Sequence, residues 1–256
     1  MKTRYFITAA AALLLGATAS LAQPSYPIFR TGDKITVDGV LGEASWQSAP
    51  KLSDLADIRD DKSLPLPTKN TTIKMLWDDT YLYIGAYLEE DEVIATLKGR
   101  DVIIYKENDF EVFIDPEGDG QNYYEFEFSA AGEFMDLIMD KPYSVGGNFF
   151  MPWDCKGLVV KTHIDGTPND PAVKDKGWGI EIAIPRASLM RGFEKPTDRS
   201  VWRMNFSRVE YLKKQGPEEN WVWAPTGKVD IHIPAKWGYV MFVDVPATSL
   251  SKEKGK

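Results

Sequence analysis

Three glutamates alternate with apolar residues in two neighbouring segments of the chain. Glu111 lies in the first segment, Glu125 and Glu127 lie in the second, and turn-forming residues 115–120 stand between them. Side chains two residues apart in a strand share a face, so a hairpin would place all three carboxylates on one surface. Like charges repel at that separation unless a cation, an arginine or a polar ligand joins them. The surface is therefore a solvated sheet face, the acid pair of a glycoside hydrolase, or a surface that hydrogen-bonds hydroxyl groups.

Aromatic residues beside polar ones are a second chemical signal. Tyr105 precedes a polar run, and Trp221 and Trp223 lie between polar and proline-containing stretches. An exposed ring can stack on the apolar C–H face of a sugar while neighbouring carboxylates and amides bind its hydroxyls. We expect these three rings to be exposed and to stack on a ligand. Five other tryptophans lie in apolar patterns and are expected in the core: Trp46, Trp77, Trp178, Trp202 and Trp237.

Polar residues of segment 201–209 could extend the same surface. Arg203 and Asn205 alternate with Trp202, Met204 and Phe206, so the polar and apolar side chains point to opposite faces of an expected strand. The residues expected to hydrogen-bond a ligand are Glu111, Asn205, Arg208 and Arg100.

Residues 115–120 resemble part of a calcium loop. The twelfth position, where such a loop needs a bidentate glutamate, is Phe126. We therefore expect a hairpin turn, with Asp115 and Asp119 as the minor calcium candidates. No spacing typical of zinc ligands is present, and no serine-hydrolase, P-loop or dinucleotide motif occurs. Cys155 is the only cysteine, so no internal disulfide can form. We expect no cofactor and no catalysis.

The elements that must position these residues are predominantly strands. Period-two patterns, separated by turn residues such as Asp-Asp and Gly-Gly pairs, predict an all-β antiparallel sandwich of the jelly-roll or immunoglobulin-like kind. Short helices are expected only at 42–49 and 185–191. The turn-rich stretch 140–156 is too long for a plain hairpin and is a candidate functional loop. The expected strands are 72–77, 81–88, 110–114, 123–128, 134–139, 158–164, 178–184, 201–209 and 239–243.

The ends of the chain and its net charge indicate export, the excluded partners and the limits of the domain. Residues 1–22 combine a basic start, an apolar run and a Ser-Leu-Ala site, which is typical of a cleaved export signal. Without them the chain carries 28 basic and 38 acidic residues, a net charge of −10. That sign disfavours nucleic acid as a partner, and no later segment is apolar enough to span a membrane. We expect a lead-in over 23–32, one domain over 33–246, and a flexible tail over 247–256.

Several ordered motifs resemble the family 9 carbohydrate-binding modules, which are related in fold to DOMON-type domains. The opening motif spans Ile35–Trp46 and ends in Glu-Ala-Ser-Trp. The resemblance covers about residues 33–244, and its order along the chain makes it specific. Its further matching segments are Lys74–Tyr87, Asn108–Asp115, Gly177–Pro185 and the closing Lys236–Gly238.

This resemblance implies a non-catalytic sandwich that binds saccharide in an exported polysaccharide-degrading system. In such modules two aromatic rings clamp a terminal sugar and charged side chains bind its hydroxyls. The first ring position falls on Tyr105 and the following strand glutamate on Glu111. The second falls in segment 230–234, which lacks tryptophan. His232, Trp221 and Trp223 are the alternatives there, or the second ring is missing and sugar binding is lost.

We interpret the sequence as that of an exported oligosaccharide- or polysaccharide-binding protein, with glycoside hydrolases as expected partners. Two alternatives stay open. One is a haem-binding or electron-transfer accessory domain, for which Met135, Met139, Met151 and His232 are candidate axial ligands. The other is a structural domain that accompanies a glycosidase or an envelope complex and binds no small ligand.

Overall fold

A computed structural model gives the structure of the protein, and it describes residues 23–52, 55–189, 197–211 and 217–250. The expected export signal, residues 1–22, lies outside this part of the chain. Strands dominate the described residues, which hold one α-helix, α1 (Ala44–Ser48). The strands are β1 (Ser25–Arg30), β2 (Ala56–Asp57), β3 (Thr71–Trp77), β4 (Tyr81–Glu89), β5 (Phe110–Asp115), β6 (Tyr123–Phe128), β7 (Phe134–Met139), β8 (Phe149–Phe150), β9 (Val159–Asp165), β10 (Gly177–Pro185), β11 (Val201–Tyr211), β12 (Glu218–Val222) and β13 (Gly238–Pro246).

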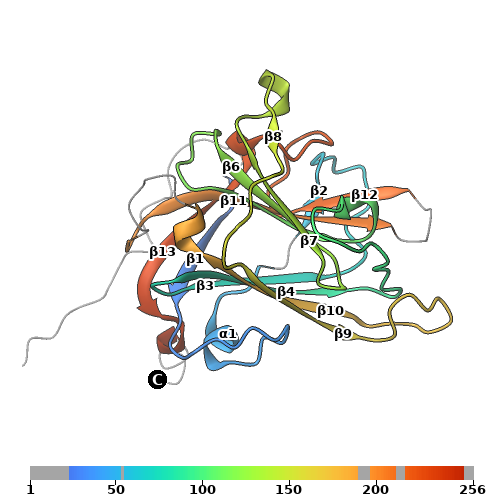
Figure 1. Ribbon diagram of the computed structural model, residues 1–256, viewed down its shortest axis with the longest axis horizontal. Helices are drawn as coiled ribbons and strands as arrows, with labels where there is room; N and C mark the ends of the chain where they lie inside the picture. Colours follow the sequence, from blue (N-terminus) through green and yellow to red (C-terminus); the bar gives the residue numbers. More distant parts are fainter. Residues whose placement is uncertain (1–22, 53–54, 190–196, 212–216, 251–256) are drawn as a thin grey trace, which may run out of the picture.

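The strands form one continuous hydrogen-bonded path that folds into a sandwich. Its order is β8-β7-β6-β5-β11-β13-β1-β3-β4-β10-β9. Strand β12 lies off this path and pairs with both β11 and β2. Figure 1 shows β3, β4, β10 and β9 below, and β6, β7, β11 and β12 above them. Strands β13 and β1 connect the two layers at one side. The all-β sandwich expected from the alternating pattern is confirmed.

The core lies between the layers because each strand turns its apolar side inward. Ile73 and Ile84 from one layer, and Val112 and Phe206 from the other, belong to the same fully buried cluster. The five tryptophans expected in the core are all buried. Full burial of a large apolar side chain contributes about 1.5–3 kcal/mol relative to leaving it exposed, so these rings are a main source of stability.

The pairing of β1 differs from the expectation of an antiparallel sheet. It runs parallel to both of its neighbours, β13 and β3. The expected lead-in therefore contributes a strand to the domain. Part of the expected tail is also packed, since Ala247 is fully buried beside Trp46 in a second apolar cluster.

Two short helices were expected and both segments form helical turns. Helix α1 lies within the expected range 42–49, and a 3₁₀ helix covers Arg186–Leu189 within 185–191. Strands β2, β8 and β12 were not expected. No helix in the described ranges is long and apolar enough to cross a membrane.

Candidate functional site

A pocket of about 350 Å³ opens on the outer face of β5, β6, β7 and β11. The three predicted glutamates all line it, as do Tyr105 and His232. Glu111 and Glu127 are directly opposite each other across the β5–β6 ladder, and Ser207 of β11 is opposite Glu111. The hairpin expected from the sequence therefore places the carboxylates on one surface.

Burial perturbs these carboxylates strongly. Glu111 and Glu125 are each 6% exposed and Glu127 is 1% exposed. Burial, followed by the charge of Glu127, raises the pKa of Glu111 to about 8. Burial raises the pKa of Glu127 to about 7, although the backbone N–H groups of Ile104 and Tyr105 donate to its carboxylate. Burial and the two neighbouring glutamates raise the pKa of Glu125 well above its usual range.

His232 closes one side of the pocket. Its Nδ1 lies 3.0 Å from the Tyr123 hydroxyl, and its Nε2 lies 3.9 Å from Glu125 Oε2. Burial lowers the pKa of His232 to about 4, so the ring is neutral at pH 7. The ring of Tyr143 meets it edge-on, with centroids 4.7 Å apart. His232 is therefore a neutral, aromatic pocket wall.

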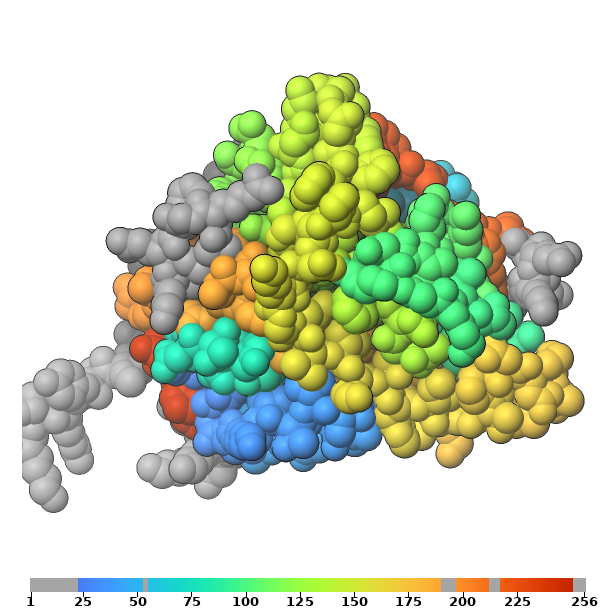
Figure 2. All heavy atoms as spheres, viewed as in Figure 1, coloured from blue at the N-terminus to red at the C-terminus, as the bar shows by residue number. Residues whose placement is uncertain are grey.

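Three exposed rings stand at this pocket. Tyr105 is 43% exposed, Tyr143 is 46% exposed and Phe149 is 53% exposed, and all three are lining residues. Tyr143 and Phe149 belong to the long segment that begins after β7, whose yellow-green chain projects above the molecule in Figure 2. Sequence reasoning marked this segment as a functional loop but did not single out either ring. Its length and its aromatic content were the available signals.

Trp221 and Trp223 are not exposed, which corrects the expectation from the sequence. They are 2% and 8% exposed and belong to the main core cluster. Trp221 is opposite Arg208 in the β11–β12 ladder. Side chains alternate between faces along a strand, so Asn220 and Glu218 of β12 reach the pocket and Trp221 points to the core.

Asn205 is also absent from the pocket. It is fully buried, and its amide both donates to the carbonyl of Ala224 and accepts from the backbone N–H of Ala224. Its polar atoms are therefore occupied in holding the segment that follows β12. Asn205 acts in this structure as a tie between two chain segments.

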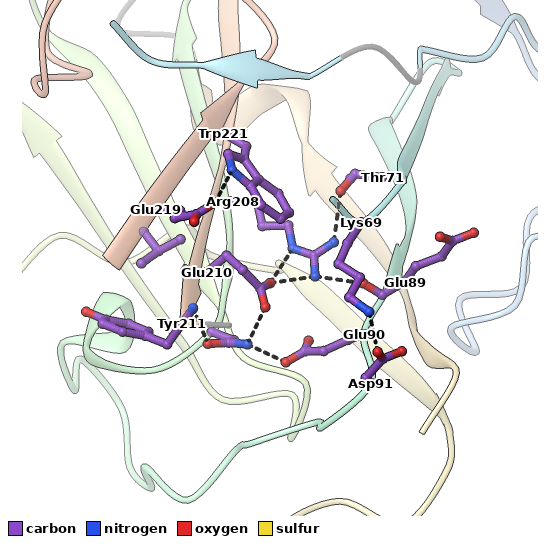
Figure 3. Close-up of polar contacts among 12 residues, drawn as sticks. Lys69, Thr71, Glu89, Glu90, Asp91, Arg208, Glu210, Tyr211, Glu219 and Trp221 are labelled. Atoms are coloured by element: carbon purple, nitrogen blue, oxygen red, sulfur yellow. Dashed lines mark hydrogen bonds and ion pairs between the residues drawn. The ribbon is translucent and has the colours of Figure 1, made fainter. Parts of the chain in front are cut away.

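Arg208 lies on the core side of β11 and does not reach the pocket. Its guanidinium donates to Glu210 at 2.6 and 2.9 Å and to the carbonyl of Glu89 at 2.7 Å (Figure 3). The Trp221 ring covers it, with 5.2 Å from the guanidinium carbon to the ring centroid. The placement corrects the expectation that Arg208 is free to bind a ligand.

Arg100 is likewise engaged within the protein. It pairs with Asp101, Asp136 and Asp154, and the Asp154 contact measures 2.7 Å. Asp136 is fully buried and also accepts from the backbone N–H of Cys155. Arg100 therefore neutralises a buried acid, and it is not among the residues that line the pocket.

Some of the candidate axial ligands for haem lie at this pocket. Met135 and Met151 line the pocket with His232, whereas Met139 is fully buried in the apolar cluster beneath. Since both ring nitrogens of His232 face oxygen atoms of Tyr123 and Glu125, an axial bond would require the ring to leave its present partners.

The calcium candidates lie in the β5–β6 turn. Both carboxylate oxygens of Asp115 accept backbone N–H groups, from Gly118 and Gly120, at 2.8 Å each. Carboxylate oxygens of Asp115, Glu117 and Asp119 also come within 4.8 Å of one another. Asp115 thus has a structural role in the turn, and the preference for a turn over a calcium loop stays a prediction.

Taken together, the described strands form a β-sandwich that carries an acidic, ring-lined pocket on one sheet face. The chain belongs to the family described as "Carbohydrate family 9 binding domain-like", whose model matches residues 37–245. This family consists of carbohydrate-binding modules and not of catalysts, so the protein is a carbohydrate-binding module and not an enzyme. The family resemblance seen in the sequence is confirmed.

Curated relatives match part of the chain. Exoglucanase XynX from Acetivibrio thermocellus is 30% identical over 118 residues, which is 46% of this chain and 9% of that protein. Endo-1,4-beta-xylanase A from Thermoanaerobacterium saccharolyticum is 29% identical over 118 residues, 46% of this chain and 8% of that protein. The chain thus spans less than a tenth of the length of either relative.

Solved structures share the fold. A Bacteroides uniformis protein described as a candidate carbohydrate-binding protein has a TM-score of 0.68 at 19% identity, covering 86% of this chain and all of that one. A family 9 module from Caldicellulosiruptor kristjanssonii in complex with cellotriose has a TM-score of 0.59 at 16% identity, covering 85% of this chain and 94% of that one. A family 9 module from the same organism in complex with glucose has a TM-score of 0.59 at 15% identity, covering 85% of this chain and 96% of that one.

Proposed function

We propose that the protein is an exported saccharide-binding module whose ligand site is the pocket on β5, β6, β7 and β11. A sugar ring stacks on Tyr105 and on Tyr143 or Phe149, and its hydroxyls bind Glu111, Glu127 and Asn220. The observation that carries the proposal is the meeting of exposed rings and buried carboxylates in one pocket. Saccharides need that combination, because their rings have apolar C–H faces and polar edges.

In this proposal Tyr143 supplies the second stacking ring that the sequence analysis expected from another position. Segment 230–234 supplies His232, which packs edge-on against Tyr143. The Tyr143 ring is the more exposed of the two. We therefore assign the stacking role to Tyr143 and the role of a supporting wall to His232.

Truncating a stacking ring should remove binding without unfolding the protein. The Tyr105→Ala and Tyr143→Ala variants should each bind cellotriose at least about tenfold more weakly, because a lost ring contact of about 1.4 kcal/mol or more has that effect. Their melting temperatures should stay near that of the unmodified protein. Isothermal titration calorimetry and thermal unfolding measure the two quantities.

Two control variants sharpen this experiment. Tyr239→Ala removes a half-exposed ring that stacks on Arg203 outside the pocket, so it should leave cellotriose binding unchanged. Trp46→Ala removes a fully buried ring that donates to Glu181, so it should cost about 3–5 kcal/mol of stability. If the two pocket variants behave like Tyr239→Ala in binding, or like Trp46→Ala in unfolding, the proposed site is wrong.

The proposal also includes export of the protein and its association with glycoside hydrolases. The signal-like residues 1–22 support export, and the names of the two curated relatives support an association with glycoside hydrolases. Mass analysis of the protein released from the producing cell should find a chain that starts at Gln23. A product that keeps residues 1–22 would contradict export by cleavage.

A further inference from the structure

The pocket carries five acidic residues and no lysine or arginine among its described lining residues. The acids are Glu111, Glu125, Glu127, Glu218 and Asp230. Tyr105 and Tyr143 add ring faces, whose electron-rich surfaces attract cations. A ligand in this pocket therefore meets a field that favours positive charge and opposes negative charge.

Other buried acids of this chain have partners within the protein. Asp136 pairs with Arg100, and Glu210 pairs with Arg208. Glu181 accepts from two backbone N–H groups and from the indole of Trp46. At these three positions the buried carboxylate is neutralised or hydrogen-bonded within the protein.

Glu125 departs from that pattern. It is 6% exposed and lines the pocket, yet its hydrogen bond is to Glu127, another acid. The His232 Nε2 atom is 3.9 Å away, beyond hydrogen-bond distance. No described nitrogen donates to its carboxylate within hydrogen-bond distance. Glu125 therefore shares a proton with Glu127, and no positive group of the described chain pairs with the two acids.

A metal ion is a poor candidate for the positive partner of Glu125. A metal ion needs several ligand atoms gathered closely around one point. Among the described acids, three have carboxylate oxygens within 4.8 Å of one another, namely Asp115, Glu117 and Asp119. Glu125 is not among them. An ammonium group needs only one or two carboxylates in contact, and it gains from the field of the others. The titratable groups that face Glu125 are Asp109, Glu111 and Glu127. Glu218, Asp230 and His232 line the wall of the pocket.

We propose that the pocket is selective for saccharides that carry a protonated amino group, which binds between Glu125 and Glu127 while the sugar ring stacks on the pocket tyrosines. This inference rests on the proposed function and narrows its ligand class. Neutral saccharides bind more weakly, because a hydroxyl relieves the carboxylate repulsion only in part. Saccharides with carboxylate groups are rejected, because they add negative charge to the cluster.

The test compares two trisaccharides that differ at one position of each ring. The β-1,4-linked glucosamine trimer carries an amino group where cellotriose carries a hydroxyl, so shape and linkage are matched. Titration calorimetry at pH 6.5 should give at least about tenfold tighter binding of the glucosamine trimer. The preference should shrink in 0.5 M salt, because salt screens charge interactions.

Variants locate the preference. Glu125→Gln should reduce the ratio of the two affinities to about threefold or less while cellotriose binding persists. The variant should fold, since glutamine keeps the shape of the buried acid and can still donate a hydrogen bond to Glu127. Asp244→Asn, which removes an exposed charge of β13 outside the pocket, should keep the full preference.

The outcomes separate this inference from the proposal beneath it. Equal affinities, or tighter binding of cellotriose, overturn the amino-sugar inference and leave saccharide binding in place. A preference that survives Glu125→Gln also overturns it, since the charge recognition then lies elsewhere. Failure of both trisaccharides to bind overturns the proposed function itself.

Discussion

The Arg208→Ala variant is expected to lose about 3–5 kcal/mol of its free energy of unfolding, because removing one member of a buried ion pair leaves the other charge without compensation. The Arg208 and Glu210 side chains are 1% and 3% exposed. Asn108 also bridges Glu210 to Glu90, so the loss would reach a second buried acid. The Trp221 ring would lose the group that it covers. Urea unfolding at pH 7 measures the change.

Two further variants show that the buried charge causes this loss. Arg199→Ala removes an exposed arginine whose contact with Asp198 is 3.6 Å long, so it should cost under about 1 kcal/mol. The double variant Arg208→Met, Glu210→Leu removes both buried charges and should regain much of the lost stability. If Arg208→Ala is as mild as Arg199→Ala, the network does not stabilise the fold as described.

Stability should fall as the pH rises from 6.5 to 8. Burial and neighbouring charges raise the pKa of Glu111 to about 8 and that of Glu127 to about 7. The folded protein therefore holds protons that the unfolded chain has released above its ordinary glutamate pKa near 4.5, and deprotonation on the way to pH 8 destabilises the fold. At about 1.4 kcal/mol per pH unit and group, the loss over this window is roughly 2–3 kcal/mol.

His232 opposes this decline, but mainly below the window. Burial lowers the pKa of His232 to about 4, so between about 4 and 6.5 the unfolded chain binds a proton that the folded protein does not. That histidine raises stability as the pH increases, and its contribution fades above pH 6.5, where the unfolded chain also loses the proton. Below pH 6.5 the histidine and the glutamates therefore act in opposite directions.

Glu111→Gln is the variant that tests the cause. It should flatten the decline between pH 6.5 and 8, whereas Asp244→Asn should leave it unchanged. Urea unfolding at four pH values within the window gives both slopes. Stability that increases with pH across the window would show that the pocket carboxylates are ionised in the folded protein at pH 6.5.

The sequence was sufficient for most strands and for the acidic face of the pocket. Alternation in 110–114 and 123–128 is a local property, and it correctly placed Glu111, Glu125 and Glu127 together. Strand β12 was missed because most of it is polar, so Trp221 within it and Trp223 just after it were interpreted as loop rings. Their burial depends on pairing with β11, and periodicity along one segment carries no information on that pairing.

The ring positions of the site show the same limit. Tyr105 was found because it precedes a recognisable strand motif. Tyr143 and Phe149 reach the pocket only through the path of the long segment after β7, which no periodic pattern describes. Arg208 and Asn205 looked like ligand-binding residues because they are polar. Their partners lie at Glu89, Thr71 and Ala224, and a tertiary contact of this kind leaves no local signature.

The parallel pairing of β1 with β13 has a consequence for how the protein folds. Residues 25–30 hydrogen-bond to a strand that starts more than two hundred residues later, so the two layers cannot be joined at this side until β13 is available. A sheet that depends on such distant pairings has a high contact order and forms slowly. Until β13 has been synthesised, β1 can pair only with β3, through Phe29 and Arg30. A delay at that stage leaves its side chains Tyr26 and Ile28 accessible to chaperones and to other chains.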